Sequence, residues 1–172
     1  AGGTLIAIGN ATRFIANQEN QLSALRRERA WQSETTSQQA KDAKSEDNKN
    51  GIAGTRLNSP EEWREHITPL AESPDHVAGV LAYAHTDSDH WLAAGLPEQL
   101  TVLLRGNDIY APLRLNEGRN VVSYQAADQL LASGHLWEEN RLQLAFKPYL
   151  SIEAKQAGFI IAFNADPNYR AY

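Results

Sequence analysis

One short segment concentrates side chains that could bind a metal ion. Residues 85–90 (HTDSDH) place two imidazoles and two carboxylates within six positions. These side chains, His85, Asp87, Asp89 and His90, are of the types that bind zinc or manganese. The segment falls where an expected strand ends and an expected helix begins, and helix capping explains acidic residues there. We therefore predict no metal in this chain, and we keep a metal-dependent hydrolase centred on these four residues as an alternative.

A second pair, His135 and Glu138, has the H-x-x-E spacing that supplies two zinc ligands in some peptidases. Such a site needs a third ligand, which is normally a distant downstream histidine, and no histidine follows His135. Glu138 is explained as an acidic residue in the first turn of a helix. We predict no zinc site at this pair.

Other catalytic chemistries lack their characteristic residues. The sequence has no cysteine, which excludes a thiolate nucleophile, and it has no G-x-S-x-G, G-x-G-x-x-G or P-loop pattern. Ser123 and Ser133 have no distinguishing context. Trp91 and Trp137 lie beside apolar residues, so we expect both to pack in the core. We predict no catalytic residue and no cofactor-binding residue in this chain.

Composition limits the class of protein. The 172 residues are 42% hydrophobic, which is enough for one globular domain, and the net charge of −5 argues against a nucleic-acid partner. The basic cluster Arg26, Arg27 and Arg29 is expected to be a solvated helix face. No apolar run is long enough to span a membrane. The chain opens without Met directly into an apolar strand, so we expect it to be part of a longer protein.

The elements that must position these residues alternate along the chain. Strands are expected at 4–8, 77–84, 100–104 and 120–124, and helices at 18–31, 59–66, 87–95 and 137–144. Ser59, Pro60 and Glu62 form a helix-start signature. Residues 149–154 and 159–164 predict a hairpin, and the polar stretch 32–50 predicts a flexible insert in a single domain spanning 1–172. The alternation favours an α/β fold with a mainly parallel sheet and an antiparallel element near the C-terminus.

Three stretches resemble the C-terminal region of one protein family. Residues 89–97 (DHWLAAGLP) are similar to a His-Pro-Leu-Ala-x-Gly-Leu-Pro turn, and residues 134–140 (GHLWEEN) to a Ser-Gly-Tyr-Leu-x-x-Glu-Asn segment. Residues 159–170 (FIIAFNADPNYR) resemble the strand and Asp-Pro-Asn-Phe-Arg turn near the end of the same proteins. These are bacterial zinc carboxypeptidase-like enzymes of the carboxypeptidase A type, whose peptidase domain precedes a domain resembling class I glutamine amidotransferases. The resemblance is clearest over 77–172, and residues 2–10 also fit, as an internal strand of the sheet.

This resemblance implies a flavodoxin-like three-layer sandwich that is an accessory, non-catalytic domain. The implied partner is the upstream peptidase domain of the same polypeptide, which would hold the zinc, and the implied location is periplasmic or secreted. An alternative is a small-molecule or glycan-binding module that uses the loops after Ile8 and Ala84, because open α/β sheets bind ligands at the carboxyl ends of their strands.

Overall fold

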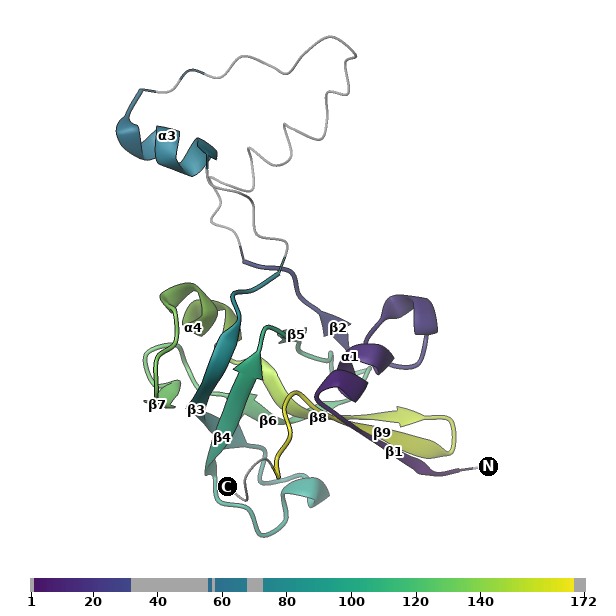
Figure 1. Cartoon of the computed structure of the whole chain (residues 1–172). Helices are drawn as coiled ribbons and strands as arrows, with labels where there is room; N and C mark the ends of the chain where they lie inside the picture. Colours follow the sequence, from purple (N-terminus) through teal and green to yellow (C-terminus); the bar gives the residue numbers. More distant parts are fainter. Residues whose placement is uncertain (1, 32–55, 57, 68–72, 169–172) are drawn as a thin grey trace, which may run out of the picture. The chain divides into compact units, whose positions relative to one another are not determined.

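The computed structural model describes residues 2–31, 56, 58–67 and 73–168. The chain divides into two compact units, one formed by residues 1–29 with 73–172 and the other by residues 30–72 (Figure 1). The polar stretch 32–50 lies outside the described residues. The first unit carries the sheet, and the features discussed below belong to it.

A seven-stranded sheet dominates this unit. Its main path follows the order β1-β9-β8-β6-β3-β4, and β7 pairs with β3 off this path. The strands in that order are β1 (Thr4–Ile8), β9 (Gly158–Phe163), β8 (Pro148–Lys155), β6 (Arg119–Tyr124), β3 (Val77–Thr86) and β4 (Gln99–Gly106), with β7 at Leu131–Ser133. A separate two-stranded sheet joins β2 (Arg26–Arg27) to β5 (Tyr110–Ala111).

The predicted flavodoxin-like sandwich with a mainly parallel sheet is wrong. Among the described strands only β1 and β9 run parallel, and every other pairing is antiparallel. Parallel neighbours need a crossover of a dozen or more residues, usually a helix. The link from β3 to β4 instead contains only the 3₁₀ turn Trp91–Ala93, and β8 turns directly into β9. Short apolar runs reveal that strands exist but do not reveal their direction, and this caused the error.

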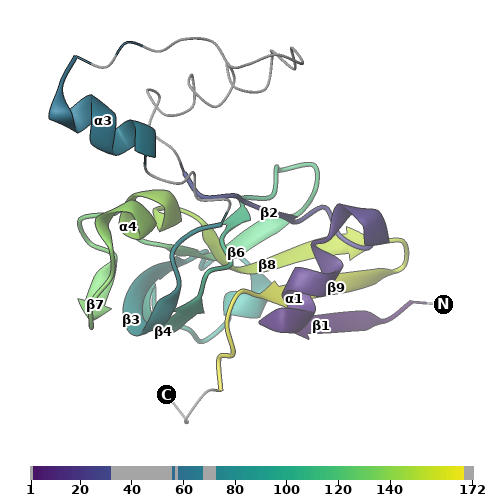
Figure 2. The same ribbon diagram turned by 45° about the horizontal axis from the view of Figure 1, so that its top comes forward.

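The described residues form three short helices, α1 (Asn10–Ile15), α3 (Pro60–Ile67) and α4 (Glu138–Leu144), which are drawn in Figure 2. The predicted start of α3 is confirmed, because the Glu62 amide donates to Ser59 Oγ at 3.1 Å. The helix at 137–144 and the hairpin of β8 and β9 are also confirmed. None of the described helices has the length and apolarity needed to cross a membrane.

The helix expected at 18–31 is wrong. Residues Gln18–Asn20 form a 3₁₀ turn, Gln21 takes the left-handed conformation, and β2 follows. Arg27 forms an ion pair with Asp108 instead of facing solvent on a helix. The window offers only two leucines for an apolar stripe, so tertiary pairing outweighs its weak helical preference.

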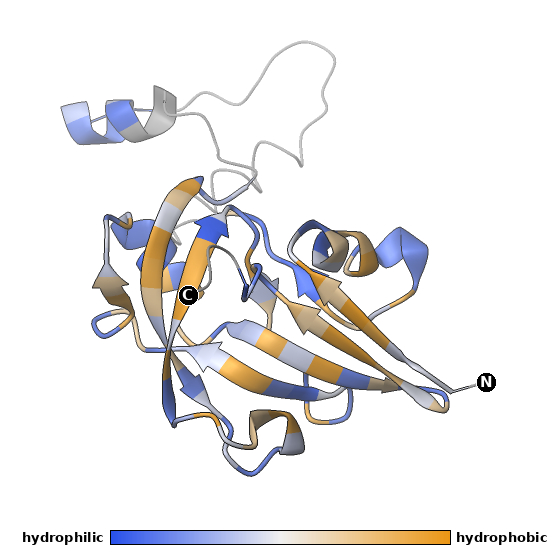
Figure 3. Cartoon of the chain, turned by 60° about the horizontal axis from the view of Figure 1, so that its bottom comes forward, coloured by the Kyte–Doolittle hydropathy of each residue, from blue (hydrophilic) through white to orange (hydrophobic). Residues whose placement is uncertain are grey.

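The curved sheet buries two apolar clusters. One lies beneath α1 and includes Ala7, Ile15 and Ile160. The larger one spans β3, β4, β6 and β8 and includes Val121, Tyr124 and Leu144. Figure 3 shows the corresponding apolar colouring along the strands of the main sheet. Residues 2–10 do not form the internal strand that the resemblance implied, because β1 is an edge strand that pairs with β9.

Gly158 should be intolerant of substitution because β1 passes close to it. A Cβ at Gly158 would lie 2.0 Å from the Gly3 carbonyl oxygen, while a Cβ at Gly3 would meet nothing within 4 Å. Gly158→Ala is therefore expected to lower the free energy of unfolding by about 1–3 kcal/mol. Gly3→Ala is the matched control and should change it by less than about 0.5 kcal/mol. Urea denaturation followed by circular dichroism measures both, and equal stabilities of the two variants would contradict the described packing of β1.

Candidate functional site

The loops after Ile8 and Ala84 follow strands that run in opposite directions. β1 and β9 run parallel, while the antiparallel steps through β8 and β6 make β3 run opposite to β1. The carboxyl ends of β1 and β3 therefore lie at opposite ends of the sheet. The sheet therefore does not place the two loops side by side at one of its ends, as the expected parallel sheet would.

A polar cavity instead lies at the carboxyl end of β1, with a volume of 470 Å³. Three segments of the chain line it. The segment after β1 contributes Gly9, Asn10 and Arg13, and the segment after β9 contributes Asn164, Ala165 and Asp166. The end of β4 and the residues after it contribute Leu103, Arg105, Gly106, Asn107 and Asp108. His76, before β3, completes the lining. Although β1 and β4 are the two ends of the strand order, the sheet curves enough for both to contribute.

Gly9 allows the chain to turn from β1 into α1 at this cavity. Its φ of 54° and ψ of −114° are readily reached by glycine and strained for residues with a Cβ. The Gly9 amide and the Thr12 hydroxyl both donate to the Phe163 carbonyl, at 3.1 and 2.6 Å. The start of α1 is thereby fixed against the end of β9.

Asn164, which lines the polar cavity, is hydrogen-bonded to a buried tyrosine. Asn164 is 9% exposed, and its side-chain amide donates to the Tyr124 hydroxyl at 3.3 Å. Burial raises the pKa of Tyr124 above its ordinary value. Burial, together with the nearby Asp166 carboxylate, raises the pKa of Tyr149 to about 12.

An apolar cavity of 360 Å³ adjoins the polar one. Leu103 and Asp166 line both cavities, so the two spaces meet at these side chains. Leu92 and Leu96, from the segment after β3, form one wall of the apolar cavity, and Phe163 of β9 lies in its lining.

The four metal-ligand candidates do not converge. Asp87 forms an ion pair with Arg119, whose Nε also donates to Asp87 Oδ2 at 3.2 Å. His90 uses Nδ1 to accept the Leu92 amide at 3.2 Å, while His85 and Asp89 are exposed. Among the residues that the structure describes, no group of three or more His, Asp or Glu side chains could hold a metal ion.

The His135 and Glu138 pair also does not match a zinc site. The His135 ring packs against Trp137, with ring centroids 4.9 Å apart, and Glu138 lies in the first turn of α4. No third ligand joins them in the described part of the chain. Neither histidine-containing segment offers the ligand set that a zinc peptidase needs.

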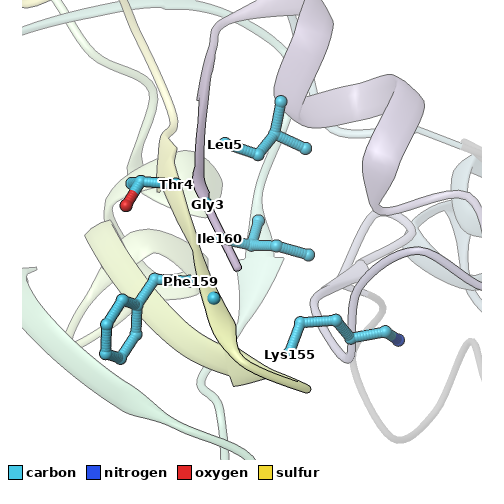
Figure 4. A pocket seen from close by; sticks show the side chains of 7 residues that line it. Gly3, Thr4, Leu5, Lys155, Phe159 and Ile160 are labelled. Carbon is cyan, nitrogen blue, oxygen red and sulfur yellow. The ribbon is translucent and has the colours of Figure 1, made fainter. Parts of the chain in front are cut away.

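The sequence analysis missed an exposed apolar surface at the β1 edge, here named the apolar edge face. It consists of four side chains that share one side of the β1–β9 pair: Ile6 (57% exposed), Ile8 (36%), Phe159 (44%) and Trp91 (61%). Figure 4 shows the alternation that produces it, with Thr4 and Phe159 on one side and Leu5 and Ile160 on the other. The Trp91 ring lies edge-on to Phe159, with centroids 6.5 Å apart.

Two of the aromatic predictions were wrong. Trp91 and Trp137 were expected in the core, yet they are 61% and 55% exposed. Their neighbours Leu92 and Leu136 turn inward instead. A tryptophan at a helix start is equally compatible with an inward or outward direction, and the sequence carries no signal that separates the two.

Comparison with known proteins gives no relative: no family model, no curated protein and no solved structure matches this chain. The resemblance to the carboxypeptidase-like family therefore still depends on its three sequence segments.

The Asp87–Arg119 pair predicts an unusually acidic carboxyl group. The Arg119 hydrogen bond holds the pKa of Asp87 below its ordinary value of 3.8. The pair therefore stabilises the fold above that pH, and its contribution is lost as the pH falls through the lowered pKa. A carboxyl-carbon NMR titration should show Asp87 titrating below 3.8, and Arg119→Gln should raise its pKa. Arg105→Gln, at the opposite end of the sheet, serves as the control, and a pKa unaffected by Arg119→Gln would contradict the pairing.

Proposed function

We propose that this chain is a non-catalytic accessory domain that docks onto a neighbouring domain through the apolar edge face. The neighbour is the zinc carboxypeptidase-like peptidase domain of the same polypeptide, as the sequence resemblance implies, in a periplasmic or secreted protein. The zinc and the hydrolytic chemistry belong to that domain. The exposure of Ile6, Phe159 and Trp91 on one side of the sheet carries the proposal.

The apolar edge face has the properties of an interaction surface. Its residues come from separate segments and gather on one side of β1 and β9, whereas exposed apolar residues on monomeric proteins are usually scattered. Contiguous apolar surface of this kind favours association, since its burial removes apolar area from water.

The adjacent strand edge supports the same conclusion. β1 (Thr4–Ile8) carries no charged residue and no proline, and its outer edge has no partner among the described strands. Proteins usually protect such an edge with charges, proline or a covering segment. A domain that covers both would protect the open strand edge and remove the apolar side chains from water.

Three of the candidate catalytic side chains are engaged in structural contacts. Asp87 is held by Arg119, His90 accepts a backbone amide, and His135 packs on Trp137. These contacts favour an accessory role over the metal-dependent hydrolase alternative.

A charge on the apolar edge face should abolish docking without unfolding the chain. Ile6→Glu is expected to weaken binding to the separately purified peptidase region at least about tenfold, because docking would bury an unpaired carboxylate. Its stability should change by less than about 1 kcal/mol, since Ile6 is 57% exposed. Isothermal titration calorimetry measures the affinity, and circular dichroism measures the stability.

Leu115→Glu is the matched control, because Leu115 is 91% exposed and lies outside the face. It should bind like the wild type. Equal affinities of the wild type and Ile6→Glu would refute docking through this face. A gene that encodes no H-x-x-E peptidase region before this chain would refute the identity of the partner.

A further inference from the structure

We infer that the two adjoining cavities form one binding site for a small amphipathic anion. Its carboxylate or phosphate group would occupy the polar cavity, and its hydrocarbon part would occupy the apolar one. This site is separate from the apolar edge face and does not depend on the proposed docking.

The sizes and the junction suit one elongated ligand. The cavities measure 470 and 360 Å³, and each alone is within the range of about 300–1,000 Å³ typical of small-molecule sites. Because Leu103 and Asp166 line both, the two cavities are neighbours, and a ligand that occupied both would contact these two side chains.

The polar cavity favours a negative charge. Arg13 and Arg105 both line it, and among the described residues Arg13 takes part in no ion pair. A guanidinium group donates paired hydrogen bonds that match a carboxylate or a phosphate. Asn10 and Asn107 add side-chain amides that can donate to the same group.

Two carboxylates also line the cavity and must be considered. Asp108 forms an ion pair with Arg27, which offsets its charge locally. Asp166 accepts the Asn168 amide through Oδ1 at 2.9 Å and lies at the junction of the two cavities. Its charge opposes an anion, so its removal should strengthen binding. The opposite result is expected for a cationic ligand.

The lining of the apolar cavity suits the hydrocarbon part of the ligand. Leu92, Leu96 and Phe163 line it, and no arginine or lysine does. Burial of each methylene of an alkyl chain there should tighten binding about fourfold. Affinity should therefore increase with chain length until the cavity is filled.

Calorimetry with three probes that each carry an eight-carbon chain tests the inference: octanoate, octyl phosphate and octyltrimethylammonium. The two anions should bind saturably at one site, with butanoate weaker than octanoate, and the cation should not bind. The better of the two anions identifies the head group. Chemical-shift changes in an ¹⁵N spectrum should centre on Asn10, Leu103 and Asp166.

Variants of the residues that line the cavity test whether binding takes place at this site. Arg13→Gln should weaken octanoate binding about tenfold, and Asp166→Asn should strengthen it, because each changes one charge at the head group. Arg114→Gln is the matched control, because Arg114 is an exposed arginine that does not line either cavity. Ile6→Glu should leave octanoate binding unchanged, which separates this site from the docking surface.

Three results would overturn the inference. These are no saturable binding of either anion, binding that is unaffected by Arg13→Gln, and binding of the cation as tight as that of octanoate.

Discussion

The Phe163 carbonyl oxygen accepts two hydrogen bonds from the other end of the chain, one from the Gly9 amide and one from the Thr12 hydroxyl. The bond from Thr12 joins residues 151 positions apart in sequence. Closing such a long loop costs conformational entropy, which the parallel ladder of β1 on β9 and the burial beneath α1 must offset. The ladder holds β1 at the edge of the sheet and holds α1 over the end of β9.

Both proposed surfaces depend on this ladder in different ways. The alternation of side chains along β1 and β9 turns Ile6, Ile8 and Phe159 to one side, where Trp91 joins them. The turns that follow the same two strands bring Arg13 and Asp166 to one cavity. One pair of strands thus supports a docking face along its length and a ligand cavity at its carboxyl end, with no residue shared between them.

The sequence predicted where most elements lie but not how they pair. Apolar runs predicted strands at 4–8, 77–84 and 120–124 and the hairpin near the C-terminus, and the structure has strands at all of these places, since each run reflects local burial. Strand direction depends on contacts between distant segments, so the parallel sheet was predicted wrongly. The exposure of Trp91 was missed as well, because its ring contacts Phe159, which lies 68 positions away in the sequence, and the local sequence does not reveal such a neighbour. The polar cavity was half predicted: the loop after Ile8 contributes, and the loop after Ala84 does not.

Hydrogen exchange at β1 tests the docking most directly. The Phe159 amide donates to Gly3, and the Gly9 amide donates to Phe163. Hydrogen-bonding groups alternate along a strand, so Leu5 and Ala7 also face β9, while Ile6 and Ile8 direct their amides to the open edge. In the 172-residue chain the Ile6 and Ile8 amides should exchange rapidly, and in the polypeptide that includes the peptidase region they should slow at least about tenfold. The Leu5 and Ala7 amides should be protected in both. Equally rapid exchange of Ile6 and Ile8 in the two proteins would contradict the account.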